Sequence, residues 1–145
     1  PAMVGEGMTG VCYNKEIFSE DEIDNITKIF KSIGKMKVVE EKLINSVVCA
    51  SGSSPAYVFM FIEAMADAAV EQGMPRAQAY KFAAQAVMGS AKMVLETGKH
   101  PGELKDMVCS PAGTTIKAVR VLEKEGFRSA VIEAMDACVD AAKGM

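Results

Sequence analysis

The chain has 145 residues, of which 50% are hydrophobic, and a formal net charge of −3 at pH 7. This net negative charge argues against a basic surface patch that would bind nucleic acid. The lack of any run of 18 apolar residues predicts that no segment spans a membrane. Only 6% of the residues are aromatic while 11 are Met, a composition that favours closely packed helices over a β-sandwich.

The four cysteines are Cys12, Cys49, Cys109 and Cys138. Their spacing is far from any CxxC pattern, and the single histidine, His100, cannot complete a metal-binding set with them. We therefore predict no metal site. The same spacing is typical of reduced thiols in an intracellular protein, so we expect a cytoplasmic chain.

Residues 2–13 favour β structure and contain Gly5, Gly7 and Gly10 in a G-x-G-x-x-G pattern. The dinucleotide-binding motif requires a strand before this pattern and a helix that opens at it. Here only four residues come first, and a strand-like Val-Cys-Tyr follows. We therefore interpret the pattern as a false match and predict no cofactor-binding residue in this chain.

A helix is predicted from Ser19, a good N-cap followed by three acidic residues, to Gly34, which is expected to end it. A short strand is predicted over residues 36–40. Because a lone strand-helix-strand unit leaves its sheet edges uncovered, residues 1–40 are predicted to be the C-terminal remnant of an α/β, Rossmann-like nucleotide-binding domain.

All signals after residue 40 are helical. Ser54 is predicted to cap a helix with Pro55 at its first position, and this helix, residues 55–72, is apolar on nearly every side. The surface that buries the apolar faces of this helix belongs either to a partner subunit or to the other helices of its own bundle. Further helices are predicted at residues 75–97, 103–108, 113–125 and 127–143. The fold class is therefore mainly α, with residues 41–145 forming a helical domain.

Two other polar features favour structural roles. His100 lies in a turn without a carboxylate or nucleophile at catalytic spacing, so we predict a surface or capping histidine. Glu63 and Asp67 lie one helical turn apart. A solvated or inter-subunit polar face is the better interpretation of this pair than an acid/base pair.

The segment Cys109–Thr115 changes from apolar residues to hydroxyls and glycine just before an apolar helix. Free N–H groups and the peptide dipoles make a helix start suitable for an anion such as a carboxylate. Ser110, Thr114 and Thr115 supply hydroxyls, and Gly113 allows close approach to the backbone. The pattern indicates either a carboxylate site or a simple helix cap.

Residues 101–123, PGELKDMVCSPAGTTIKAVRVLE, resemble the signature of the pyrroline-5-carboxylate reductases. The resemblance extends to SGSSPAY at 51–57, GMPR at 73–76, GFRS at 126–129 and the opening PAMVGEGMT. The family usually has Gly at the position of Ala112. Its cofactor motif lies N-terminal to Pro1, so the chain resembles the C-terminal half of the enzyme.

The resemblance implies reduction of the cyclic imine 1-pyrroline-5-carboxylate to L-proline, the last step of L-proline biosynthesis, with hydride from NADPH or NADH. It implies that the backbone at Gly113 and Thr114, with the hydroxyls of Ser110 and Thr115, holds the substrate, and that Thr115 is catalytic. It also implies an interleaved homodimer that assembles further to a decamer. This chain, which carries the substrate loop and the dimer interface, is expected to be inactive alone.

Two alternatives stay open at this point. The chain could be a non-catalytic helical dimerisation module, or the helical domain of another NAD(P)-dependent dehydrogenase. The residues from Ser110 to Thr115 disfavour the second alternative. Adding a nucleotide-binding half and assaying imine reduction would distinguish an enzyme from a module.

Overall fold

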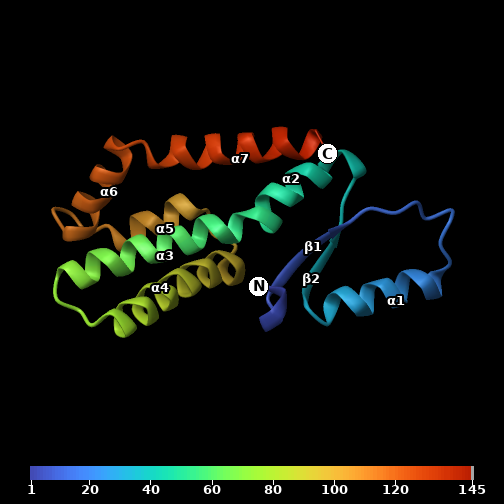
Figure 1. The fold of residues 1–145 in the computed structure, drawn as a ribbon, viewed down its shortest axis with the longest axis horizontal. Coiled ribbons are helices and arrows are strands. Elements are labelled where there is room, and N and C mark those ends of the chain that lie inside the picture. Colours follow the sequence, from blue (N-terminus) through green and yellow to red (C-terminus); the bar gives the residue numbers. More distant parts are fainter. Residues whose placement is uncertain (145) are drawn as a thin grey trace. The chain divides into compact units, whose positions relative to one another are not determined.

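The structure is a computed structural model that describes residues 1–144. They form two compact units, one made of residues 1–57 and the segment from Ile132 on, the other of Val58–Val131. The elements in chain order are β1 (Gly7–Val11), α1 (Glu20–Lys31), β2 (Gly34–Val38), α2 (Ile44–Val47), a π-helical turn (Val48–Ser53), α3 (Ser54–Glu71), α4 (Arg76–Thr97), α5 (Pro101–Val108), α6 (Thr114–Lys124) and α7 (Phe127–Lys143), with 3-10 turns at Ala2–Val4 and Glu41–Leu43 (Figure 1). The mainly helical fold class is confirmed. The domain boundary after residue 40 stays a prediction.

The first unit contains the predicted strand-helix-strand arrangement. β1 and β2 pair in parallel from Gly7 opposite Gly34 to Val11 opposite Val38. The connecting helix α1 begins with a complete capping box, in which Ser19 N–H donates to Glu22 Oε2 at 2.9 Å and Glu22 N–H donates to Ser19 Oγ at 3.4 Å. Reciprocal capping satisfies two otherwise free donors, which explains why the helix starts where the sequence predicted.

Gly34 does not end α1, contrary to the prediction. The helix ends at Lys31 with Ser32 as its C-cap, and Gly34 is the first residue of β2. Its φ of 149° is unfavourable for a residue with a side chain, and a Cβ at this position would overlap the backbone of Gly7 on the neighbouring strand. The glycine is therefore needed for the close approach of the two strands at the start of their ladder.

Ser54 is not an N-cap, contrary to the prediction. The helical conformation is continuous through α2, the π-helical turn and α3, and Ser54 has αR backbone angles. Its hydroxyl donates back to Ala50 O at 2.7 Å, as that of Ser51 does to Val47 O at 3.0 Å. The wider i→i+5 register of the π turn accommodates Pro55, which has no N–H for an α-helical bond.

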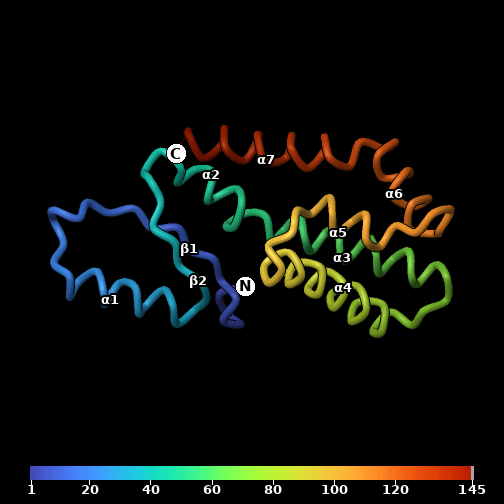
Figure 2. The backbone as a smooth tube through the Cα atoms, turned by 180° about the vertical axis from the view of Figure 1, so that it is seen from behind, coloured from blue at the N-terminus to red at the C-terminus, as the bar shows by residue number. Residues whose placement is uncertain are grey.

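The second unit is built on α3 and α4, which lie side by side (Figures 1 and 2). Gly73, with φ of 95°, makes the connection. Phe61 of α3 contacts Phe127 at the start of α7, with ring centroids 6.0 Å apart. Among the described residues of both units, the buried hydrophobic side chains are all small, namely Cys49, Ala66, Ala79 and Ala83.

Large apolar side chains of α3 and α4 are correspondingly exposed. Phe59 is 63% exposed, Met60 69% and Phe82 66%. Exposed apolar surface on this scale marks a face that another protein surface covers. Within the second unit itself these side chains are not covered.

The continuous helix Glu41–Glu71 is long and apolar enough, by length and composition, to cross a membrane. An 18-residue window within it has a mean hydropathy of 1.3, and 6% of that window is buried. The sequence criterion of 18 uninterrupted apolar residues did not find it, because Ser, Asn and Gly residues punctuate the segment. A helix whose apolar faces pack against another protein chain has the same composition, so this feature alone does not distinguish the two environments.

Candidate functional site

The loop between α5 and α6 is shaped by a turn of four residues, Ser110 to Gly113. Gly113 N–H donates to Ser110 O at 3.0 Å, which closes the turn. Pro111 occupies its second position, and Ala112 follows with φ of 59°. Proline followed by a residue of positive φ is characteristic of a type II turn. The loop is thus held by its own backbone geometry.

The hydroxyl of Ser110 lies directly against Gly113. A Cβ added to Gly113 would overlap Ser110 Oγ and would lie 3.1 Å from Ser110 O. Gly113 itself has extended backbone angles, φ −68° and ψ 173°, that any residue can adopt. A larger residue here would displace the Ser110 hydroxyl, so glycine is favoured by the close approach of Ser110 and not by the backbone conformation.

The N-terminus of α6 follows at once, and its N-cap is Gly113, which offers no side chain for capping. Thr114 and Thr115 are the first two helical residues and are exposed. Their hydroxyls are thus not at the N-cap position, which weakens the interpretation that they serve only as caps. The structure brings Ser110, Gly113, Thr114 and Thr115 together at one helix start, where backbone N–H groups and the helix dipole favour an anion.

One detail differs from the sequence expectation. The Gly113 N–H is already used in the turn with Ser110 O. The first N–H group of the helix that is open to an anion is therefore that of Thr114, followed by that of Thr115. The roles of these residues in binding and catalysis stay predictions.

Lys105 of α5 is a basic group near this loop that sequence analysis did not single out. It is half-buried and forms an ion pair with Asp106. The hydrogen bond to Asp106 raises the pKa of the lysine, which therefore stays protonated. Its sequence signal was weak because a lone Lys next to an Asp on a short helix is common on solvated surfaces.

The three glycines of the G-x-G-x-x-G pattern lie in a different context from a nucleotide loop. Gly5 follows a 3-10 turn with φ of 75°, and Gly7 and Gly10 belong to β1. A Cβ on Gly7 would lie 2.8 Å from Ile33 O, and one on Gly10 would lie 2.7 Å from Val47 Cγ1. Close packing accounts for both residues in β1. That the pattern binds no dinucleotide stays a prediction.

The remaining polar candidates have structural partners. His100 is the N-cap of α5, and its Nδ1 accepts a hydrogen bond from Gly102 N–H at 3.0 Å, which confirms the capping interpretation. Asp67 forms an ion pair with Arg76, whose guanidinium lies 5.7 Å from the ring centroid of Tyr80. No group of three His, Cys, Asp or Glu side chains within residues 1–144 could hold a metal ion.

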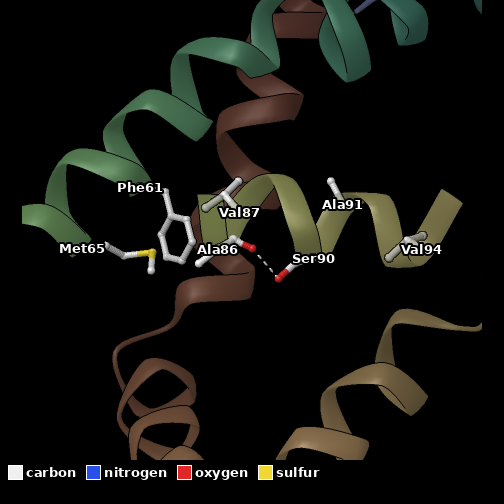
Figure 3. Close-up of a pocket in the computed structure, with 7 residues that line it drawn as sticks. All are labelled: Phe61, Met65, Ala86, Val87, Ser90, Ala91 and Val94. Carbon is white, nitrogen blue, oxygen red and sulfur yellow. Dashed lines mark hydrogen bonds between the residues drawn. The ribbon is translucent and has the colours of Figure 1, made fainter. Parts of the chain in front are cut away.

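A groove of about 460 Å³ lies between α3 and α4. Phe61 and Met65 point from α3 toward α4 (Figure 3). The lining residues are Phe61, Met65, Ala86, Val87, Ser90, Ala91 and Val94. The one hydroxyl among them, that of Ser90, donates to Ala86 O at 2.8 Å. The groove is therefore suited to apolar side chains from another surface.

Replacing Ala112 with Gly is expected to stabilise the fold by about 0.5–1 kcal/mol. The positive φ of Ala112 costs a residue with a Cβ about 1–2 kcal/mol, and the greater freedom of glycine in the unfolded chain offsets about half of this gain. Urea unfolding of both proteins measures the difference. Pro111→Ala, which removes the other turn-forming residue, serves as the opposite control, and a less stable Ala112→Gly variant would contradict the turn assignment.

Comparison with known proteins supports one family. Residues 41–145 match the family model described as pyrroline-5-carboxylate reductase dimerisation. The chain is 69% identical over 140 residues to the pyrroline-5-carboxylate reductase of Escherichia coli, covering 97% of this chain and 52% of that protein. It is 50% identical over 137 residues to the Synechocystis enzyme of the same name, covering 94% and 51%.

Among solved structures, the pyrroline carboxylate reductase of Plasmodium falciparum, with NADP bound, superimposes with a TM-score of 0.92 at 33% identity, covering 99% of this chain and 58% of that one. The chain thus spans about half the length of the relatives it matches. This chain belongs to the pyrroline-5-carboxylate reductase family and contains the dimerisation region of that family.

Proposed function

We propose that this chain is the C-terminal half of a pyrroline-5-carboxylate reductase, which reduces 1-pyrroline-5-carboxylate to L-proline with hydride from NADPH or NADH. The observation that carries the proposal is the loop from Ser110 to Gly113, which presents hydroxyls and open N–H groups at the start of α6. The substrate is a small carboxylate, the kind of ligand that a helix N-terminus binds. Membership of the family supplies the rest of the argument.

In this proposal the substrate carboxylate lies at the N-terminus of α6. The N–H groups of Thr114 and Thr115 donate to it, together with the hydroxyl of Ser110. The N–H of Gly113 holds the turn instead, and the absence of a side chain on Gly113 lets Ser110 approach. The Thr115 hydroxyl contacts the ring nitrogen of the imine. Catalysis by these residues consists of positioning the substrate, which requires no strongly acidic or basic side chain.

The packing of the β1 glycines against Ile33 and Val47, with no helix opening at them, supports the proposal that these glycines do not bind the pyrophosphate of a dinucleotide. We therefore assign the cofactor contacts mainly to the preceding half of the family enzyme, and derive no step of the chemistry from the residues of β1. NADPH and NADH are both compatible with this chain.

The assembly proposed is a homodimer through α3 and its neighbours, with dimers associating further to a decamer in the cytoplasm. The match to a dimerisation domain and the exposed apolar faces of α3 and α4 support the dimer. The sequence left open whether a partner subunit or the chain's own bundle buries the apolar faces of α3. We propose that a partner subunit buries them.

The chain alone is expected to bind neither NADPH nor NADH appreciably. The physical reason is that a dinucleotide requires a strand-loop-helix turn, and the glycines that match the pattern lie within a strand. Calorimetric titration with each cofactor measures this. Binding at micromolar concentration would contradict the assignment of the cofactor to the other half.

The function is tested by fusing this chain to the nucleotide-binding half of the Escherichia coli relative and measuring oxidation of NADPH that depends on 1-pyrroline-5-carboxylate. The fusion is expected to be active and the chain alone inactive. A fusion that folds and dimerises but does not reduce the imine would favour the alternative, a non-catalytic dimerisation module. The same fusion carrying Gly113→Val, whose side chain displaces Ser110, is the matched control.

A further inference from the structure

Two cysteines far apart in the sequence meet within the first compact unit. Cys49 belongs to the π-helical turn and Cys138 to the C-terminal part of α7, and both are free thiols. Figure 1 shows the C-terminal end of α7 next to α2, the helix that leads into the π-helical turn. The Cys138 thiol donates a hydrogen bond to Ser53 Oγ at 3.2 Å, and Ser53 belongs to the same π-helical turn as Cys49, four residues further along the chain. The hydroxyl of Tyr57 also contacts Cys138.

The two thiols have unlike surroundings. Cys49 is fully buried, whereas Cys138 is partly exposed. Hydrogen bonding with Cys138, together with burial, raises the pKa of the Cys49 thiol to about 11. Hydrogen bonding with Cys49, Ser53 and Tyr57 lowers the pKa of the Cys138 thiol. A partly exposed thiol of lowered pKa beside a buried thiol is the arrangement in which oxidation of one sulfur leads to a bond with the other.

We propose that Cys49 and Cys138 form a redox-active dithiol, which a hydroperoxide converts to a disulfide. The Cys138 thiolate attacks one oxygen of the hydroperoxide, the O–O bond breaks, and the departing oxygen takes a proton, which gives a Cys138 sulfenic acid. The sulfur of Cys49 then attacks the Cys138 sulfur and displaces hydroxide, which takes the proton of the Cys49 thiol and leaves as water. The two sulfurs are oxidised by two electrons in total and the hydroperoxide is reduced.

The bond has a defined structural consequence. It joins the π-helical turn to α7, two segments of the same unit that the chain otherwise connects only through the whole of the second unit. Closing such a long loop restricts the unfolded chain. We therefore expect the oxidised chain to melt at a higher temperature than the reduced chain, and the difference to disappear on addition of a dithiol reductant.

The test is stoichiometric hydrogen peroxide treatment of the native chain, followed by intact mass measurement and peptide mapping. The expected result is a loss of about 2 Da, corresponding to two hydrogens, with Cys49 and Cys138 in one cross-linked peptide. The Cys12→Ser and Cys109→Ser double variant retains both proposed residues and is expected to react in the same way. Cys49→Ala should leave Cys138 as a sulfenic acid that dimedone traps, and Cys138→Ser should abolish the fast reaction.

Because Cys49 is fully buried, its replacement is checked by circular dichroism before oxidation. The wild-type chain unfolded in urea is a second control that needs no variant, since unfolding should remove the preference for this pair over the other thiols. The proposal is overturned if the native chain forms mainly other pairings, or if native and unfolded chains react with the same rate and selectivity.

Discussion

Replacing Phe61 with Asp is expected to abolish assembly of the chain. Phe61 lines the groove between α3 and α4, contacts Phe127, and is nonetheless 39% exposed in the single chain. A partner subunit that covers this face would bury the new carboxylate without a counter-charge, at a cost of about 3–5 kcal/mol. The dissociation constant of the dimer should then rise by roughly two to four powers of ten. Sedimentation or light scattering over a concentration series measures the change.

Phe61→Leu is the matched control, because it shortens the side chain but keeps the surface apolar. It is expected to retain the dimer, with at most a modest weakening. The interface assignment fails if Phe61→Asp dimerises as tightly as the parent chain. A parent chain that is a folded monomer at micromolar concentration would contradict it as directly, because its exposed apolar faces would then need no partner.

Replacing Thr115 with Val in the fusion that carries the nucleotide-binding half is expected to lower kcat/KM. The expected loss of transition-state stabilisation is about 1–3 kcal/mol. This corresponds to roughly one to two powers of ten. The substitution keeps the shape of the side chain and leaves the backbone N–H in place, so it removes only the hydroxyl proposed to contact the ring nitrogen. Steady-state kinetics and a melting curve on the same preparation separate an effect on activity from one on stability.

Thr114→Val provides the comparison. Thr114 is proposed to act through its backbone N–H, which valine retains, so this variant should lose less activity. If both hydroxyls served only as caps, each variant would lose about 0.5–2 kcal/mol of stability while kcat/KM per folded enzyme stayed nearly constant. That outcome in Thr115→Val would refute its catalytic role.

The sequence predicted most of the helices because local signals and the final fold agree along most of the chain. The caps at Ser19 and His100 are both short-range features that require no tertiary information. The turn before the start of α6 was also predicted from its residues, since a turn before a helix start has a recognisable composition.

The errors arose where a distant contact determines the local conformation. Gly34 has its backbone angles because Gly7 lies opposite it, and nothing near Gly34 in the sequence indicates that neighbour. Ser54 followed by Pro55 has the pattern of a helix start. The helix nevertheless continues across both residues, because the chain adopts a π-helical register there and the Ser54 hydroxyl donates to Ala50 O. The pairing of Cys49 with Cys138 depends on α7 returning to the first unit, which spacing along the chain cannot show.

The small size of the buried side chains, Cys49, Ala66, Ala79 and Ala83, has a kinetic consequence. A chain whose large apolar residues become buried only on meeting a second copy gains most of its stabilisation in the encounter step. Recovery of native structure after dilution from denaturant should therefore follow second-order kinetics, with a half-time that shortens as protein concentration rises. For such a chain, the concentration of newly made copies governs how fast folding is completed.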